Sequence, residues 1–307
     1  MSNSLRGDAG WVSLLRPGGL VVVAQGAGEP SQLLGQLLDE SSNVPDLQVF
    51  VGLSHTGALE VPREHLPELL SFGAMGPLGA LAQVGAVGVI PCNFVDVPRV
   101  LRARAGRRLV VLMQVSAAGD GRNHSLGMAA DYTYELADEA ALVVAEINDQ
   151  LPATSAPVLA RDRIDVAIPT SRPLPQVRSR PPTAVQRRIA AHAAALVPDG
   201  AMLQLGIGVL ASAVGEQLVG RRNLRVHSPL VGDWLAVLSQ AGALSRARNS
   251  LRTCEAAGTT ELYELVAGCT GAPPTETSTK VDTTALTLRR VRPTTSLAPK
   301  PPLVCAA

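Results

Sequence analysis

An α/β fold built from two related units is predicted by three features of this sequence. Short runs of β-branched and other apolar residues alternate with helical stretches, which is typical of strands buried beneath helices. One stretch of the chain recurs about 180 residues later. Hydrophobic residues make up 46% of the 307 residues but aromatic residues only 3%, which favours tightly packed α/β layers over an aromatic-rich β-sandwich.

The repeat relates residues 15–38, LRPGGLVVVAQGAGEPSQLLGQLL, to residues 196–219, LVPDGAMLQLGIGVLASAVGEQLV. Each copy has Leu-x-Pro-x-Gly, a short apolar strand, a Gly-x-Gly loop and a helical apolar run with a glycine at the same offset. A second strand follows each copy, at 47–53 and at 224–230. We interpret the copies as two related strand–loop–helix units; chance similarity between two such units is the alternative.

The rest of the first unit follows in order along the chain. Continuous apolar runs at 87–91, 108–116 and 141–148 predict strands that are buried on both faces of a parallel sheet. A helix is expected between the first two of them, at 97–106. The first unit therefore has the alternation of strands and helices that an open α/β sheet needs.

A segment rich in proline and arginine separates the two units. Residues 169–183 read PTSRPLPQVRSRPPT, and proline fixes φ and removes an amide donor, so we expect a linker here. The predicted domains are residues 1–170 and 184–268, joined by a linker at 171–183. The second domain opens with a helix at 184–197.

Residues 269–307 differ in composition from everything before them. They hold nine Thr and six Pro and have no sustained apolar period, so they cannot bury enough surface to offset the entropy of ordering. We expect a disordered tail in place of the remaining strands of the second unit, as a shifted reading frame or a truncated gene would produce. The second unit is then incomplete at its C-terminal end, or a partner covers it.

Charge and cysteine content disfavour several classes of protein. A net charge of +1 argues against a broad nucleic-acid-binding surface. The N-terminus lacks the apolar core of a secretory signal, and the most apolar window, 79–95, is interpreted as a buried helix and strand, not a membrane span. The scattered cysteines predict no metal site or disulfide framework and favour a reduced, cytoplasmic setting; they are Cys92, Cys254, Cys269 and Cys305.

We expect ligands to bind at the ends of the repeated strands, where the loops leave the sheet. A strand, a Gly-x-Gly loop and a helix can present backbone amides to an anion, and Gly206–Ala211 fits a loose dinucleotide fingerprint. No acidic residue follows about 20 residues later to hold a ribose, so tight turns and close helix packing remain the alternative to dinucleotide binding. Asp233 is expected to cap the helix that starts at Trp234.

Five collinear stretches resemble the acetyl-CoA hydrolase/transferase family, which includes CoA-transferases. The resemblance runs from about residue 15 to about residue 268. It implies two tandem Rossmann-like domains of CoA-transferase type with an active site between them. The stretches are 90–101 (IPCNFVDVPRVL), 125–133 (SLGMAADYT), 143–152 (VVAEINDQLP), 196–208 (LVPDGAMLQLGIG) and 226–235 (VHSPLVGDWL).

The resemblance also implies a mechanism, in which a glutamate carboxylate attacks the acyl-CoA thioester and becomes a covalent CoA carrier. That glutamate follows a strand in a pattern like H-T/S-E-x-x-x-D. Here His227, Ser228 and Asp233 match the pattern, and Pro229 takes the place of the glutamate. A second departure is INDQLPATS, which keeps Asn148, Gln150 and Pro152 but has Ala153 and Ser155 where the family has arginine and histidine.

We therefore predict a transferase or hydrolase homologue of acyl-CoA metabolism in which Pro229 replaces the family's nucleophilic glutamate, which places transfer activity in question. The alternative is a non-catalytic subunit or degenerate fragment that a partner protein completes. The predicted ligands are an acyl-CoA, whose CoA thioester is the substrate, and a carboxylate. We expect no permanently bound cofactor and no binding to nucleic acid or membrane. The chain is expected to form a homo-oligomer or to bind a partner that covers the incomplete second unit. Predicted binding residues are Gly26, Gly28, Gly206, Gly208, His227 and Ser228, and Asp233 is the candidate catalytic base for hydrolysis.

Overall fold

The computed structural model of the chain describes residues 10–60, 66–118, 121–247 and 250–268, with the two-residue strands β15 (Val281–Asp282) and β16 (Val304–Cys305). The chain divides into two compact units. The first comprises residues 1–153 and 158–175, and the second comprises 154–157 and 176–307. The domain boundaries at 170 and 184 stay a prediction, and the predicted tail lies outside the described residues except for β15 and β16.

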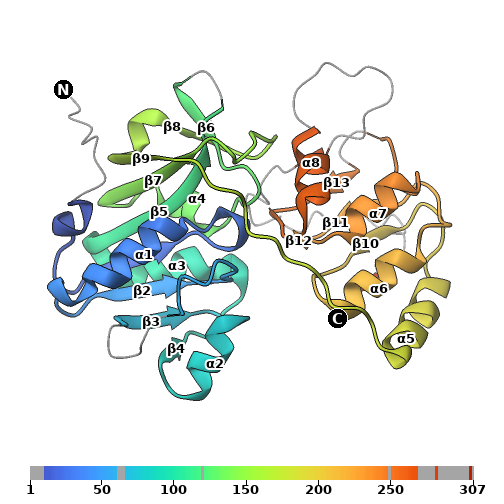
Figure 1. Ribbon diagram of the computed structural model, residues 1–307, viewed down its shortest axis with the longest axis horizontal. Helices are drawn as coiled ribbons and strands as arrows, with labels where there is room; N and C mark the ends of the chain where they lie inside the picture. Colours follow the sequence, from blue (N-terminus) through green and yellow to red (C-terminus); the bar gives the residue numbers. More distant parts are fainter. Residues whose placement is uncertain are drawn as a thin grey trace, which may run out of the picture. The chain divides into compact units, whose positions relative to one another are not determined.

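The first unit is built on a seven-stranded, wholly parallel sheet (Figure 1). The chain builds outward from the central strand β1 in one direction through β2, β3 and β4, and then in the other through β5, β7 and β9. The reversal between β1 and β5 makes the sheet doubly wound. The strands are β4 (Val87–Val89), β3 (Glu68–Ser71), β2 (Gln48–Val51), β1 (Leu20–Val23), β5 (Leu109–Ser116), β7 (Leu142–Asn148) and β9 (Val166–Thr170), in sheet order.

Helix α1 (Ser31–Glu40) covers one face of this sheet. Its apolar side chains recur at the spacing that puts them on one face of a helix, and all of them are buried against alternate valines of the strands. Helix α2 (Pro77–Gln83) adds Leu78 to the same cluster. The buried residues of α1 are Leu33, Leu34, Leu37 and Leu38.

Aromatic residues cover part of the opposite face. Phe50 alternates with Val49 and Val51 along β2, so it points away from the α1 side. Its ring lies 5.4 Å from that of Tyr132, and Phe94 lies 5.8 Å from Tyr132, centroid to centroid. Helices α3 (Val97–Ala105) and α4 (Tyr132–Leu136) supply Leu101 and Leu136 to this side, while β6 (Asn123–Ser125) and β8 (Val158–Ala160) form a separate antiparallel pair.

The predicted burial of the 87–91 strand on both faces is wrong. β4 is the edge strand of the sheet, and only Val87 in it is buried, whereas Val89 is 49% exposed. An edge strand has one neighbour instead of two, so its apolar sequence does not guarantee burial. The 108–116 and 141–148 runs form β5 and β7, whose residues are buried almost throughout.

The second unit repeats this topology on a smaller scale. Its central strand β10 (Met202–Gln204) lies between β11 (Arg225–His227) and β16, and β13 (Leu251–Arg252) and β15 extend the sheet beyond β11, all in parallel. β11 thus occupies the same position beside β10 that β2 occupies beside β1 in the first sheet. The predicted α/β fold of two tandem Rossmann-like units is confirmed, and both sheets reverse beside the first strand of the repeat.

In the described part of the second unit, consecutive helices pack side by side along the sheet. They are α5 (Ala184–Ala195), α6 (Val209–Gln217), α7 (Trp234–Gln240) and α8 (Thr260–Gly268). Gly215 of α6 lies so close to α7 that a Cβ added there would overlap the Cβ of Trp234. β12 (Leu230–Val231) and β14 (Glu255–Ala256) form a separate parallel pair of strands. In the sequence, β12 lies between β11 and α7, and β14 lies between β13 and α8. Within the described ranges, no helix has the length and apolarity that a membrane crossing needs.

Candidate functional site

The two Gly-x-Gly loops occupy equivalent positions in the two units. The first loop, Gly26–Gly28, follows β1 and precedes α1. The second loop, Gly206–Gly208, follows β10 and precedes α6. Each lies at the carboxyl end of the central strand of its sheet, where ligands bind in open α/β folds.

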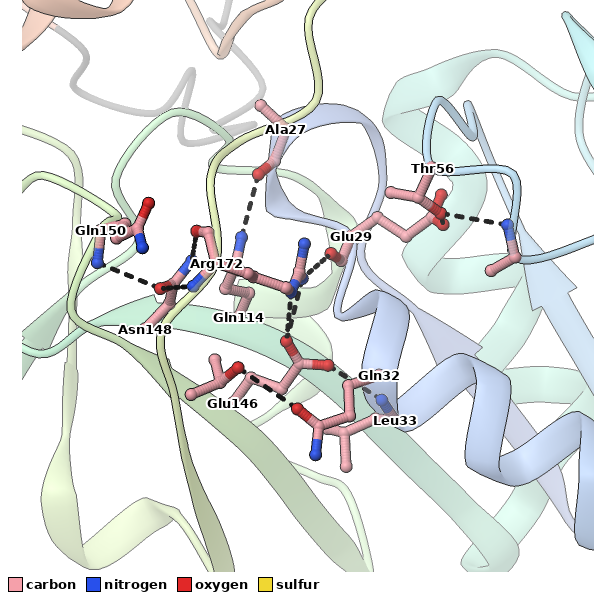
Figure 2. Close-up of polar contacts among 12 residues, drawn as sticks. Ala27, Glu29, Gln32, Leu33, Thr56, Gln114, Glu146, Asn148, Gln150 and Arg172 are labelled. Carbon is pink, nitrogen blue, oxygen red and sulfur yellow. Dashed lines mark hydrogen bonds and ion pairs between the residues drawn. The ribbon is translucent and has the colours of Figure 1, made fainter.

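Side chains from neighbouring strands hold the first loop (Figure 2). The Gln114 amide at the end of β5 donates to the carbonyl oxygen of Ala27 at 3.1 Å. The Arg172 guanidinium, just after β9, donates to the carbonyl oxygen of Glu29 at 2.8 Å. The loop is thereby fixed by polar groups of its own unit.

A buried carboxylate occupies the N-terminus of α1. Glu146 on β7 has no exposed surface, and its Oε1 accepts the backbone N–H of Leu33 at 2.9 Å. Its Oε2 accepts from Nε and Nη2 of Arg172 at 3.1 and 2.9 Å (Figure 2). A helix N-terminus favours an anion, and here the protein supplies its own. The backbone N–H of Leu33 is therefore engaged by the protein's own carboxylate and is not available to an external anion.

Asn148, at the carboxyl end of β7, links this network to the segment after β9. Its amide nitrogen donates to Gln114 Oε1 and to the carbonyl oxygen of Arg172, both at 2.9 Å. Its oxygen accepts from the backbone N–H groups of Gln150 and Arg172 at 3.0 and 3.2 Å. Sequence reasoning missed Arg172, because it assigned the whole of 171–183 to a linker; no local pattern relates Arg172 to Glu146.

Glu29 adds a second buried carboxyl to the first loop. The Thr56 hydroxyl donates to its Oε1, while its Oε2 has no hydrogen-bond partner among the described residues. Burial raises the pKa of Glu29 to about 7, although the Thr56 hydrogen bond and the charge of Arg172 act in the opposite direction. Glu29 therefore titrates near neutral pH instead of near its ordinary value of 4.5.

The second loop is open by contrast. A hollow of about 510 Å³ lies beside it. Gly208 has a φ of 102°, which favours glycine, and it offers no side chain to cap α6. The first backbone amides of α6 thus remain without a side-chain cap. The hollow is lined by Gln186, Gln204, Gly206, Ile207, Gly208, Val209, Leu210, Ala211, Ser228 and Pro229.

The predicted site residues after β11 divide into different roles. Ser228 is fully buried, and its hydroxyl oxygen lies 2.6 Å from the carbonyl oxygen of Leu205 and 2.9 Å from that of Leu230, so it ties the loop to β12. Pro229 lines the hollow, and its carbonyl oxygen accepts the backbone N–H groups of Cys254 and Glu255. His227 is the half-buried last residue of β11.

The predicted capping role of Asp233 is wrong. Its backbone is helical, at φ −57° and ψ −21°, and its side chain makes no capping hydrogen bond to α7. Instead its Oδ1 accepts the backbone N–H of Thr259 at 2.7 Å and the Thr259 hydroxyl at 3.1 Å, at the start of α8. Asp233 lines a different hollow, of about 320 Å³, with Trp234 and Thr259 among its neighbours.

The structure thus brings Gly206, Gly208 and Ser228 together with Pro229 around one hollow. Gly26 and Gly28 belong to the other unit. No described residue that lines the hollow has an ionisable side chain, so the hollow offers hydrogen-bond donors without a nucleophile or a base. Among the described residues, no cluster of His, Cys, Asp and Glu side chains could hold a metal ion.

Comparison with characterised proteins relates the chain to CoA-transferases. It is 30% identical over 255 residues to the 4-hydroxybutyrate coenzyme A transferase of Clostridium kluyveri, a match that covers 80% of this chain and 59% of that protein. It is 29% identical over 243 residues to the succinyl-CoA:acetate/propanoyl-CoA:succinate CoA transferase of Fasciola hepatica, with 78% and 51% covered. The chain thus spans between half and three-fifths of the length of these relatives. No protein-family model matches it.

Solved structures give the same result. RipA from Yersinia pestis superposes with a TM-score of 0.75 at 25% identity, covering 82% of this chain and 63% of RipA. The 4-hydroxybutyrate CoA-transferase from Porphyromonas gingivalis superposes with a TM-score of 0.66 at 26% identity, covering 83% and 62%. By sequence and by fold, this chain is a homologue of CoA-transferases, as its collinear motifs indicated.

Proposed function

We propose that this chain binds acyl-CoA thioesters in the hollow beside its second glycine loop and that Pro229 removes covalent CoA transfer from it. One observation carries the proposal. Pro229, which takes the place of the family glutamate, lines a hollow together with the Gly206–Gly208 loop and the uncapped start of α6. The substrates that we assign are an acyl-CoA and a carboxylate acceptor, by analogy with the reactions that the relatives' names describe.

The chemistry of the hollow supports binding without covalent transfer. The amides of the first turn of α6 are suitable donors for a thioester carbonyl oxygen, on which negative charge develops when the carbonyl is attacked. A carboxylate would then attack the carbonyl carbon, but the pyrrolidine ring of Pro229 has no atom that can do so. Binding is therefore separated from the step that makes the family's covalent intermediate.

Hydrolysis by water is the activity that remains open to such a site. Asp233 is the candidate base for this hydrolysis. Its Oδ1 accepts two hydrogen bonds from Thr259, and it lines the separate hollow of about 320 Å³, not the hollow beside the second loop. Free thiol release from acetyl-CoA and succinyl-CoA measures the reaction. Hydrolysis that is lost in a folded Asp233→Asn variant supports the assignment, whereas full activity in that variant excludes Asp233.

Binding can be followed with Trp234, one of two tryptophans in the chain. Its indole N–H donates to the carbonyl oxygen of Gly206 at 3.2 Å, so a ligand on the loop should change its fluorescence. Trp11 is bonded to Gln36 in the other unit, and a Trp11→Phe variant leaves a single reporter. Saturable quenching or enhancement by acetyl-CoA is the expected result, and a signal that stays flat up to millimolar ligand contradicts the proposal.

Covalent transfer should be recoverable at position 229. We expect Pro229→Glu to exchange labelled CoA between an acyl-CoA and a free carboxylate, and the wild-type chain and a Pro229→Ala control not to do so. The substitution breaks no backbone hydrogen bond of residue 229, because proline has no N–H to lose and the Pro229 carbonyl oxygen keeps its donors. Exchange by the wild-type chain would refute the proposed role of Pro229.

A second candidate function is that of a non-catalytic subunit completed by a partner. The burial pattern of the second sheet favours it: Leu203 and Val226 are buried, but Gln204 is exposed and Arg225 and His227 are only half-buried. Every residue of β1 in the first unit is buried. Expression of the chain alone and together with an intact CoA-transferase paralogue separates the candidates: a monomer that binds acyl-CoA argues for the first, and solubility only in a co-purifying complex argues for the second.

A further inference from the structure

Helix α5 of the second unit has an apolar face that is exposed. Its buried residues are two alanines, Ala190 and Ala194. On the opposite side, Val185 is 64% exposed, Ile189 46% and Leu196 77%. At about 100° per residue these three side chains lie within about 40° of one another around the helix axis, since the residue after α5 keeps helical backbone angles. The helix thus buries its smallest apolar side chains and exposes its largest, which is the reverse of a helix with a single packed face.

The sequence around this apolar face is positively charged. Residues 171–198 contain five arginines and no acidic residue. One of them, Arg188, is exposed and lies about 60° from Val185 around the helix, at the edge of the apolar face. A partner surface that fits α5 is therefore apolar in its centre and acidic at its border.

Charge disfavours two possible occupants of this face. Two copies of α5 packed face to face would bring their arginines together, and like charges repel. Residues 269–307 of the same chain hold five basic and two acidic residues, so they carry the wrong charge as well. The occupant has to be acidic.

The first unit has a hollow with the required properties. Its volume is about 390 Å³, and it lies at the amino ends of β2 and β3, because Gln48 and Glu68 begin those strands. That is the end of the sheet opposite the first glycine loop. Asp39 and Asp46 are exposed at the hollow, whereas Glu68 is paired with Arg104 at 3.5 Å. Its apolar lining consists of Leu38, Val44, Leu47, Leu66 and Pro67.

The charge of the chain is divided unequally along the sequence. Residues 19–98, which contain every residue of the hollow, hold eight acidic residues and one basic residue, a net charge of −7. Residues 171–198 have a net charge of +5. The overall charge of +1 thus combines an acidic and a basic segment, and opposite charges of this kind steer and orient association.

We propose that the apolar face of α5 in one copy of this chain docks into the acidic hollow of a second copy. Val185 and Ile189 contact the apolar lining, and Arg188 pairs with Asp39 or Asp46 at its border. Because the two surfaces differ, the contact is heterologous, and copies join head to tail until a ring closes. The inference does not depend on the proposed acyl-CoA binding.

Sedimentation velocity on the full chain measures this association. The weight-average sedimentation coefficient of the wild-type chain should rise from micromolar to millimolar protein at low salt and rise less at high salt, since salt screens exposed charges. Arg188→Glu and Asp39→Arg should each weaken the association by at least about tenfold, because like charges then meet. Ile189→Ser should weaken it as well, at both salt concentrations.

A mixture of the two charge variants tests whether these two surfaces meet. In the mixture, the acidic side chain at position 188 of one variant meets the basic side chain at position 39 of the other, and the unchanged pair meets at the second contact. Association that is lost in each variant alone should therefore return on mixing. The matched controls are Arg246→Glu and Asp162→Arg, which reverse exposed charges outside α5 and the hollow and should associate like the wild-type chain.

Each other outcome overturns the inference in a recognisable way. A wild-type chain that stays monomeric up to millimolar protein excludes the contact. Association that persists in both charge variants places the contact elsewhere, and association that does not return on mixing excludes the pairing of these two surfaces. Equal losses in the control variants would assign the effect to net charge. Thermal unfolding of each variant verifies that it remains folded.

Discussion

The loop at Gly26–Gly28 and the loop at Gly206–Gly208 each follow the central strand of a parallel sheet and precede a helix. In the first unit, Glu146 and Arg172 fill the space at the helix start and bind the loop. In the second unit, the helix start is uncapped and borders a hollow. The same backbone element is therefore held by side chains in one unit and borders an open hollow in the other, because a few buried polar side chains are present in only one of them.

The largest expected effect is on the stability of the first unit when the contact between Arg172 and Glu146 is removed. Arg172→Ala leaves Glu146 buried without its cation, which we expect to lower the free energy of unfolding by about 3–5 kcal/mol. Urea unfolding measures it. Arg104→Ala removes an exposed ion pair with Glu68 and should cost less than about 1 kcal/mol. Equal losses in the two variants would contradict a buried role for Arg172.

Protonation of Glu29 gives the next largest effect. Its folded-state pKa of about 7 lies above the ordinary 4.5, so the folded first unit holds a proton that the unfolded chain releases, and stability falls as pH rises from about 4.5 through 7. The 2.5-unit difference corresponds to about 3 kcal/mol.

Glu29→Gln removes that titration. Urea unfolding between pH 4.5 and 7.5 should then give a flatter pH dependence in the variant than in the wild-type chain. Parallel curves for the two proteins would show that another group is responsible for the pH dependence.

Equivalent glycines of the two repeats should respond with opposite signs. A Cβ at Gly215 overlaps Trp234, so Gly215→Ala should destabilise by about 1–3 kcal/mol. A Cβ at Gly35 of α1 meets nothing within 4 Å, so Gly35→Ala should stabilise by up to about 1 kcal/mol through helix propensity. Thermal unfolding of both variants checks the prediction. The same sign at both sites would mean that the helices of the two units pack alike.

The smallest effect distinguishes the two loops directly. Inorganic phosphate at millimolar concentration should slow amide hydrogen exchange in 206–211 and leave 26–33 unchanged, since the Glu146 carboxylate already occupies the start of α1 whereas Gly208 offers no side chain to cap α6. Weak binding of this kind stabilises by less than about 1 kcal/mol. Protection of residues 26–33 instead would mean that phosphate displaces Glu146.

Several features of the fold could be predicted from local pattern alone. The runs that form β5 and β7 are long and β-branched, so burial on both faces leaves a clear signal in them. The strand β3, ELLS, was not predicted, because four residues with two leucines fit a helix as well as a strand. The edge position of β4 depends on which strands lie beside it, and the residues of the 87–91 run do not indicate their neighbours.

The site was predictable to the same degree. Gly206, Gly208, Ser228 and Pro229, which two short segments singled out, line one hollow, and their role as a site stays a prediction. Their roles were not all predictable: Ser228 is bonded to two carbonyl groups, and Asp233 is bonded to Thr259, 26 residues away. Hydrogen bonds between distant segments depend on how strands are ordered in the sheet, so the sequence around each residue has no trace of them.

Composition, apolar periodicity and the internal repeat were enough to establish an α/β chain of two related units, and collinear motifs were enough to relate it to CoA-transferases. Apolar periodicity and each short motif involve residues a few positions apart, where backbone geometry dictates the pattern. Folding alone decided which loop is closed and which is open, because Glu146, Arg172 and Gln114 come from three separate segments and meet only when β5, β7 and β9 are ordered side by side. The register of β11 and β13 likewise sets Arg252 beside His227, and this pairing exists only in the assembled sheet.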